Sequence, residues 1–188
     1  MGSKFIYGVH ENPIIAAVKK DSNMQEVISS QCNVIFLLYG NISNIKDIVN
    51  ELHKDKKIVY IHVDLIDGIS NDIYGLEYIV KKVKPDGIIT TKGSLITAAK
   101  KMGIFTIQRL FILDSLSYDR SIRSAKKYEP DAIEILPGII HKVTRKISME
   151  LRMPIIAGGL IKDKEDVIEA IKAGATAVSS TNSKVWEL

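Results

Sequence analysis

The stretches Pro154–Gly159 (PIIAGG) and Ala177–Asn182 (AVSSTN) carry the strongest fold signal in this chain of 188 residues. Each begins as a short apolar run and ends in small or hydroxyl residues. Bare glycine backbone and Ser/Thr hydroxyls let a phosphate approach closely, and the N-terminus of a following helix would add N–H donors and a favourable dipole. In a (β/α)8 barrel, the loops after strands 7 and 8 usually form that site. The expected phosphate contacts here are Gly158, Gly159, Ser179, Ser180 and Thr181.

Outward from these two stretches, apolar runs alternate with segments of helical spacing along the whole chain. Near-continuous apolar runs are typical of parallel strands that are buried on both faces. Between them, Ile45, Ile48, Val49 and Leu52 recur at the spacing of one helix face. The expected strands are Ile14–Val18, Val34–Tyr39, Ile58–Leu65, Gly87–Thr91, Phe105–Phe111, Ala132–Leu136, Ile155–Gly158 and Ala177–Ser180.

This alternation predicts an α/β fold, a small (β/α)8 TIM-like barrel. The helix after the first strand is short, and only a stub follows the eighth, so we expect a truncated last helix. An open doubly wound sheet is the alternative architecture. Because no linker or shift in composition divides the chain, residues 1–188 are expected to form a single domain.

Composition restricts the class of protein. A hydrophobic content of 46% with mixed charges favours a globular protein, and no apolar run is long enough to span a bilayer. The sequence also lacks a signal-peptide pattern, and the single cysteine, Cys32, rules out an internal disulfide. We therefore expect a cytoplasmic protein with no membrane partner. The net charge of +4 permits an anionic partner without requiring one.

Several polar residues lie at the expected strand ends, where barrels carry function. Period two places His62 and Asp64 on one face of the third strand, directed into the barrel. An inward carboxylate is costly unless it is paired or bound to a ligand, and a ligand hydroxyl would serve Asp64. Arg109 in the fifth strand has two open interpretations. It pairs with Glu134 of the sixth strand, or it holds a phosphate through two N–H groups.

Two further residues are candidates on loops. The Pro137-Gly138 turn leads toward a helix and is expected to offer the Gly138 N–H to an anion. Lys92 follows the fourth strand as a phosphate contact, a solvated side chain or a Schiff-base lysine. The histidines lack metal-ligand spacing, so no metal is expected. Neither a Ser/His/Asp elbow nor a Walker loop is present.

Six motifs, in order along the chain, resemble those of the glycerol-uptake operon antiterminator regulatory proteins. The resemblance spans roughly Pro13 to Trp186. It implies a (β/α)8-like barrel that senses glycerol 3-phosphate, binds the leader mRNA of a glycerol operon and prevents premature termination. It implies a regulator without a cofactor, and not an enzyme. The motifs are His62–Gly68, Asp86–Thr91, Ile107–Asp114, Asp131–Gly138, Ile156–Ile161 and Ser179–Asn182.

On this interpretation, the glycerol hydroxyls face Asp64 and Glu134, and RNA meets a basic outer surface on two neighbouring helices. Ordinary solvated helix faces are the alternative for these cations, and homo-oligomerisation is left open. The alternative function is a small barrel enzyme, an isomerase, aldolase or lyase of a phosphorylated metabolite. Its acid and base would be drawn from Asp64, Glu134 and Lys92. The expected RNA contacts are Arg120, Arg123, Lys127, Lys142, Arg145 and Lys146.

Overall fold

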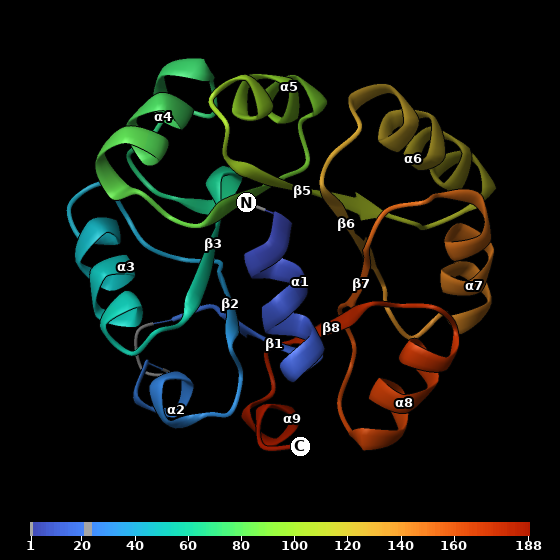
Figure 1. The fold of residues 1–188 in the computed structure, drawn as a ribbon. Helices are drawn as coiled ribbons and strands as arrows, with labels where there is room; N and C mark the ends of the chain where they lie inside the picture. Colours follow the sequence, from blue (N-terminus) through green and yellow to red (C-terminus); the bar gives the residue numbers. More distant parts are fainter. Residues whose placement is uncertain (1, 21–23) are drawn as a thin grey trace.

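Eight parallel strands close into a barrel in sequence order, with β8 paired back onto β1 (Figure 1). The computed structural model describes residues 2–20 and 24–188. The closed barrel confirms the predicted fold class and rules out the open sheet. The strands are β1 (Ile14–Val18), β2 (Val34–Leu37), β3 (Ile58–His62), β4 (Gly87–Thr90), β5 (Phe105–Phe111), β6 (Ala132–Leu136), β7 (Ile155–Gly158) and β8 (Ala177–Ser180).

Helices cover the outside of the barrel and connect successive strands. Asp72, Asp114 and Asp163 each cap a helix by accepting hydrogen bonds from backbone N–H groups of its first turn. The last helix is short, as expected. The helices are α1 (Gly2–Glu11), α2 (Met24–Ser29), α3 (Ile45–Lys54), α4 (Ile73–Tyr78), α5 (Gly93–Lys101), α6 (Ser115–Tyr128), α7 (His141–Glu150), α8 (Lys164–Lys172) and α9 (Ser183–Trp186).

The third strand ends earlier than the sequence predicts. The prediction ran to Leu65, but β3 stops at His62, and Val63–Leu65 form a 3-10 turn. The last paired residues of β3 and β4 are His62 and Ile89. Beyond them, the Asp64 carboxylate accepts hydrogen bonds from the β4 end, so a side-chain contact replaces further ladder pairing. The second strand likewise ends at Leu37, two residues before the predicted end.

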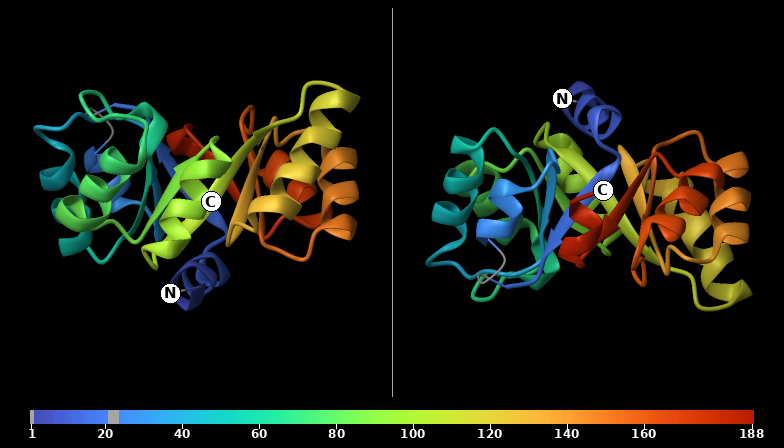
Figure 2. Two further views of the ribbon diagram at one scale, coloured as in Figure 1. Left: turned by 90° about the horizontal axis from the view of Figure 1, so that it is seen from above. Right: turned by 90° about the horizontal axis from the view of Figure 1, so that it is seen from below.

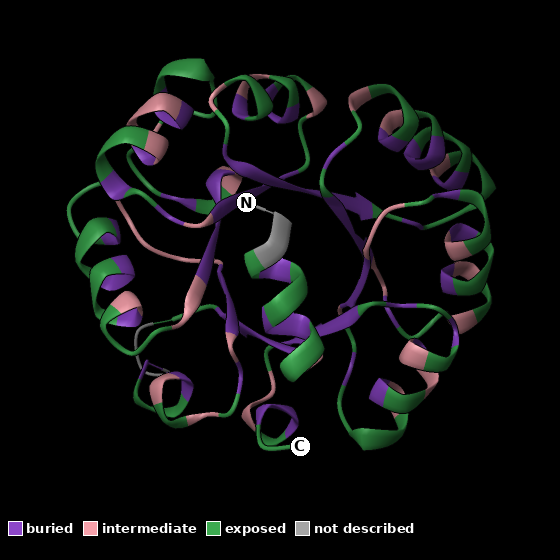
Figure 3. Ribbon diagram, in the orientation of Figure 1, coloured by how far each residue is buried: buried purple, intermediate pink, exposed green. Residues whose placement is uncertain are grey.

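The core has two layers, one inside the barrel and one between the strands and the helices. Figure 3 shows that the strands are mostly buried, whereas the helices carry both buried and exposed residues. Residues that face outward from the strands pack under the helices, and the helical-spacing residues of α3 are all buried there. Residues that face inward fill the barrel, with Phe36, Tyr60 and Phe105 among the largest. Alternation along β5 places Ile107 and Arg109 on this inner side. Among the described residues, no helix combines the length and apolar character needed to cross a membrane.

Helix α1 covers the end of the barrel at which the strands begin, here called the N-terminal face (Figure 2). Its Phe5 stacks on Phe105 at 5.1 Å between ring centroids and meets Tyr60 edge-on at 5.6 Å. Both Phe5 and Val9 are buried. This helix was not predicted, although the spacing of four residues between Phe5 and Val9 is a helical signal. It closes one end and leaves the opposite end of the barrel open to a ligand.

Candidate functional site

A cavity of about 420 Å³ opens where the strands end, between the loops that follow β7 and β8 and the ends of β5 and β6. We call it the mouth cavity. Its position matches the site predicted from the two C-terminal stretches. Its lining residues are Ala17, Lys19, Leu38, Arg109, Phe111, Glu134, Leu136, Gly159, Leu160, Ile161, Lys162, Ser179, Ser180, Thr181 and Asn182.

The floor of the mouth cavity is an ion pair braced by a hydroxyl. Arg109 Nε donates to Glu134 Oε2 at 2.6 Å, and Ser179 Oγ donates to Glu134 Oε1 at 2.6 Å. The Glu134 side chain is only 1% exposed, so the pair lies in a largely water-free environment. Of the two interpretations of Arg109, pairing with Glu134 is therefore observed. Ligand contact by Arg109 stays a prediction, and the position of Arg109 in the lining is compatible with it.

A neutral histidine lies beside this pair. His62 faces into the barrel as expected and is 2% exposed. Its Nδ1 lies 4.0 Å from Asp64 Oδ2 and has no hydrogen-bond partner among the described residues. Burial lowers the pKa of His62 to about 4, and repulsion from Arg109 acts in the same direction. The imidazole is therefore uncharged near neutral pH.

The rim of the mouth cavity exposes backbone where β7 ends. Gly159 has a φ of +77°, a conformation that favours glycine. A Cβ on Gly158 would lie 2.6 Å from both Glu134 Oε1 and Ser179 Oγ, so a side chain there would displace the floor. In the described part of the chain, no hydrogen bond occupies the N–H of Thr181. This amide is free to donate to an anion.

Ser180 has a bracing role at the same rim. Its Oγ donates to the Ile161 carbonyl at 2.9 Å and accepts from the Asn182 N–H at 3.2 Å. Its own carbonyl accepts from Trp186 Nε1 at 2.7 Å. The hydroxyl is therefore engaged in holding the β7 and β8 loops together. Phosphate contact by Ser180 stays a prediction.

Two expected sources of N–H donors are used within the protein. Gly138 was expected to offer its N–H to an anion, but this group donates to the carbonyls of Gly158 and Gly159. The turn is also separated from α7, which begins only at His141. The N-terminus of α8 is likewise occupied, because its N–H groups meet Asp163 and its first turn is acidic. The open amide of Thr181 is left for a phosphate.

Asp64 and Lys92 lie apart from the mouth cavity, at the ends of β3 and β4. Asp64 accepts from Thr90 Oγ1 at 2.8 Å, from the Thr91 N–H at 2.8 Å and from Thr91 Oγ1 at 2.9 Å. These three donors offset the cost of the half-buried carboxylate without a ligand. Lys92 Nζ donates to the Asn71 carbonyl at 3.1 Å. Neither residue lines the mouth cavity, and their ligand roles stay predictions.

The mouth cavity also contains residues that the sequence reasoning missed. Lys19 and Lys162 bring two cations to the rim, and Asn182 borders it. The signal for Lys162 was its place directly after the Gly-Gly-Leu-Ile motif. Lys19 had no such signal, because only barrel closure brings the end of β1 beside β8. In the described ranges, no three His, Cys, Asp or Glu side chains gather into a potential metal site.

The six residues expected to contact RNA are all exposed on α6 and α7. The ammonium of Lys146 lies 4.2 Å from the centre of the Tyr118 ring, and that of Lys127 lies 5.2 Å from the Tyr128 ring. Two of the six cations are thus held by aromatic rings of the protein itself. The α6/α7 stripe, as we call these six residues, stays a predicted contact surface.

Comparison with known proteins supports one family. The family model described as "Glycerol-3-phosphate responsive antiterminator" matches residues 14–186. A glycerol uptake operon antiterminator regulatory protein from Listeria monocytogenes is 36% identical, with a TM-score of 0.91 over 94% of this chain and 95% of that one. A related protein from Thermotoga maritima is 33% identical, with a TM-score of 0.83 over 93% of this chain and 98% of that one.

Among curated proteins, the Escherichia coli protein YgcP, described as uncharacterized, is 44% identical over 180 residues, or 96% of this chain and 94% of that one. An aldolase with 13% identity and a TM-score of 0.74 shares the barrel fold alone. The family match and the two antiterminator structures agree with the resemblance drawn from the six motifs. The chain belongs to the glycerol-3-phosphate responsive antiterminator family.

Proposed function

We propose that this protein regulates glycerol-uptake genes by transcription antitermination and that glycerol 3-phosphate, bound in the mouth cavity, is its effector. The observation that carries this proposal is the mouth cavity itself. Its volume of about 420 Å³ suits a small metabolite, and it combines cations, an open amide and a polar floor. The effector is taken from the family, and the structure supplies a place with matching chemistry.

The phosphate end of the ligand would lie against the β7 and β8 loops. The N–H of Thr181 has no partner in the described part of the chain and can donate to a phosphate oxygen. Gly159, which carries no side chain, lets the ligand approach the loop after β7 closely. Lys19 and Lys162 would neutralise a dianion from two sides of the rim. Charge-assisted hydrogen bonds of this type are about twice as strong as neutral ones. The phosphate should therefore supply most of the affinity.

The glycerol end would reach down to the floor. Glu134 keeps acceptor capacity beyond its bonds to Arg109 and Ser179, and a carboxylate can accept from about four directions. Only Nε of the Arg109 guanidinium is engaged with Glu134. The floor thus presents both an acceptor and donors to vicinal hydroxyls. We assign the polyol to Arg109 and Glu134, with Asp64 and Lys92 as more distant candidates.

A regulator is the better-supported class, since the family and the two similar antiterminator structures are regulatory. The partner we propose is the leader mRNA of a glycerol operon, which would place the protein in the cytoplasm. The α6/α7 stripe is the contact surface expected from the sequence, and the oligomeric state is left open. An isomerase, aldolase or lyase remains the competing function. It differs in a measurable way, because an enzyme converts its ligand and a sensor does not.

Isothermal titration with glycerol 3-phosphate, glycerol and inorganic phosphate tests the ligand. We expect saturable binding of glycerol 3-phosphate, weaker binding of phosphate and the weakest binding of glycerol. Thr181→Glu should abolish binding, because its carboxylate would repel the phosphate at an exposed rim position. Thr97→Glu, exposed on α5, is the matched control and should bind normally.

Phosphorus NMR of the same mixtures tests the competing function. The expected result is an unchanged glycerol 3-phosphate signal after prolonged incubation. Equal affinity for glycerol and glycerol 3-phosphate would contradict the assignment of the phosphate to the loops. Conversion of a triose or glycerol phosphate into a new species would replace the regulator by an enzyme.

A further inference from the structure

The N-terminal face carries an arc of lysines beside α1. Three segments, residues 54–57, 81–86 and 100–103, hold eight lysines and only two acidic residues. They lie at the C-terminal ends of α3, of the π-helix Ile79–Val83 that continues α4, and of α5, so they lie side by side around one half of the barrel. Five of these lysines are exposed and form neither an ion pair nor a side-chain hydrogen bond with any described residue, whereas Lys81 pairs with Glu77 and Lys100 donates to the Glu129 carbonyl. We call them the lysine arc: Lys54, Lys56, Lys82, Lys84 and Lys101.

Helix electrostatics explains part of this arc but not all of it. Lysines in the last turn of a helix interact favourably with its C-terminal dipole, which suffices for Lys54, Lys82 and Lys101. Lys56 and Lys84 lie beyond those helix ends. Their φ angles are +59° and +60°, in the left-handed region where glycine is the favoured residue. A strained backbone conformation that carries a charged residue points to a role other than stability.

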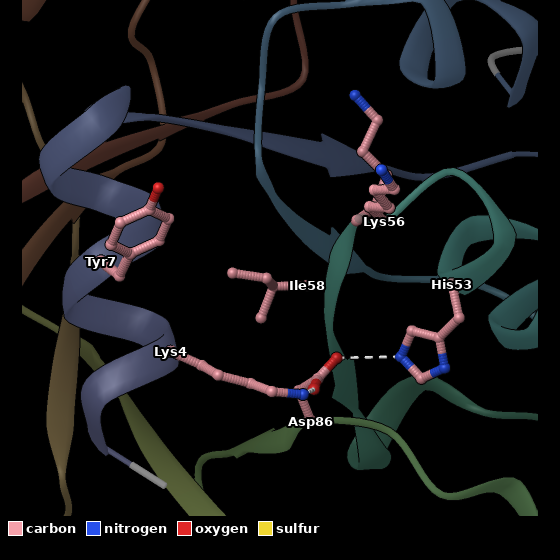
Figure 4. Close-up of a pocket in the computed structure, with 7 residues that line it drawn as sticks. Lys4, Tyr7, His53, Lys56, Ile58 and Asp86 are labelled. Carbon is pink, nitrogen blue, oxygen red and sulfur yellow. Dashed lines mark hydrogen bonds and ion pairs between the residues drawn. The ribbon is translucent and has the colours of Figure 1, made fainter.

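At the centre of the arc, an ion pair joins α1 to the barrel, and we call this contact the anchor. Lys4 of α1 donates to Asp86 Oδ1 at 2.8 Å, and His53 Nε2 lies 2.9 Å from Asp86 Oδ2 (Figure 4). Burial opposes ionisation of Asp86, but hydrogen bonds from Lys4, the Val59 N–H and His53 lower its pKa. The ionised Asp86 carboxylate is thus already paired with Lys4 and His53 and is not left to pair with a lysine of the arc.

Two hollows flank this anchor. One, of about 660 Å³, is bordered by Tyr7 and Lys56 with Ile58 between them (Figure 4). The other, of about 430 Å³, is bordered by Lys84 and lies toward α5. Both hollows include Lys4 and Asp86 in their linings, so they adjoin each other across the anchor. Each of the two strained lysines therefore borders one hollow.

The chemistry of this surface fits a flexible polyanion with flat bases. Proteins bind single-stranded nucleic acid with a basic groove that follows the backbone and with aromatic rings on which bases stack. Tyr7 is 67% exposed at the edge of the first hollow, so its ring is available for stacking. Unpaired lysines offer the phosphate contacts that dominate affinity. The two rings beside the α6/α7 stripe are less accessible, because Tyr118 is 8% exposed and Tyr128 is only partly exposed and lies under Lys127.

We propose that the N-terminal face binds single-stranded RNA, with Lys56 and Lys84 contacting backbone phosphates and Tyr7 stacking on a base. This inference rests on the proposed function for its partner and names the surface that the partner uses. It places the RNA at the opposite end of the barrel from the mouth cavity. It also replaces the α6/α7 stripe as the main contact surface.

The test variant exploits the backbone strain. Lys56→Gly combined with Lys84→Gly removes two charges at positions where glycine relieves strain, so the melting temperature should not fall. A structural role for these lysines would instead lower it. Binding is measured by fluorescence anisotropy with a labelled 20-nucleotide oligouridylate and with a glycerol-operon leader RNA, over a range of salt concentrations.

The double glycine variant should bind both RNAs more weakly. The slope of log affinity against log salt should become less steep by about 1.4, or roughly 0.7 for each lost phosphate contact on a single strand. Tyr7→Ala should weaken binding by roughly 5- to 150-fold, the range for loss of one stacked base. Arg120→Gln combined with Arg145→Gln removes the same charge from the α6/α7 stripe and should leave the affinity nearly unchanged.

The outcomes separate the surface from the function. If the stripe variant loses binding and the double glycine variant keeps it, the surface is wrong and the proposed function stands. If oligouridylate binding depends on Lys56 and Lys84 but the leader RNA binds no better than other RNA, the surface stands and the specific antiterminator function is in doubt. If the wild-type protein binds neither RNA, both proposals fail.

Discussion

The ion pair on the floor of the mouth cavity gives a sharp stability prediction. Arg109→Met would remove the cation and leave the Glu134 carboxylate at 1% exposure with Ser179 as its remaining donor. Breaking a buried pair by removing one partner typically costs about 3–5 kcal/mol. For a domain of this size, each kcal/mol lowers the melting temperature by about 2–4 °C. The variant should therefore melt roughly 6 to 20 °C below the wild type.

The compensating variant separates charge burial from packing. Arg109→Met combined with Glu134→Leu removes both charges and should recover most of the loss, to within about 1–2 kcal/mol, with Ser179 left without its acceptor. Neither variant should bind glycerol 3-phosphate if the floor holds the polyol. Calorimetry and titration on the two variants measure both effects.

An exposed pair on the outer surface supplies the control. Lys126→Met breaks the pair with Glu150, in which the Lys126 side chain is 54% exposed and that of Glu150 36%, and should lower the melting temperature far less than Arg109→Met does. If Arg109→Met cost no more than this control, the floor would not be a desolvated ion pair. If the double variant were no more stable than Arg109→Met, the loss would come from packing and not from the unpaired charge.

Two more variants test the rim and the inner histidine. Gly159→Ala and Gly103→Ala both place a side chain at a left-handed residue, with φ of +77° and +73°, and should each cost about 1–2 kcal/mol. Only Gly159→Ala should weaken glycerol 3-phosphate binding, and an equal effect of both on binding would contradict the rim assignment. The pKa of His62 is near 4 in the folded state and near 6.5 in the unfolded state. The neutral imidazole therefore contributes stability that is fully present above pH 6.5 and is lost as the pH falls toward 4. His62→Gln should therefore lose less unfolding free energy between pH 7 and pH 4.5 than the wild type in urea titrations, and identical losses would contradict a buried neutral histidine.

The sequence was sufficient for the barrel because parallel strands have a plain signature. Runs such as Phe105–Phe111 and Ala132–Leu136 are buried on both faces except at their last residues, and their predicted limits match the observed ones. The end of β3 was predicted wrongly because the length of a strand depends on the hydrogen bonds that the neighbouring strand can form with it. Asp64 meets the Thr90 and Thr91 hydroxyls, a contact between residues far apart in sequence. Pattern alone could not show that this contact would end the ladder.

The candidate site was predictable in its motifs but not in its hydrogen bonds. The glycine pair and the Ser-Ser-Thr-Asn stretch do lie together at the mouth cavity. The use of the Gly138 N–H by the carbonyls of Gly158 and Gly159 depends on the pairing of β6 with β7, which spacing does not encode. Lys19 reached the rim only through closure of β8 onto β1. Helix α1 was not predicted because it lies before the repeating pattern of strands and helices, which begins at β1.

Read-through of a terminator tests the central claim most directly. A template that carries a glycerol-operon leader and its terminator is transcribed in a single round, with and without the protein and glycerol 3-phosphate. We predict that full-length transcript increases only when the protein and glycerol 3-phosphate are both present, and that glycerol cannot replace the phosphorylated ligand. Read-through that stays at the level of the template alone, under conditions in which titration shows the protein to be saturated with glycerol 3-phosphate, would contradict a ligand-controlled antiterminator.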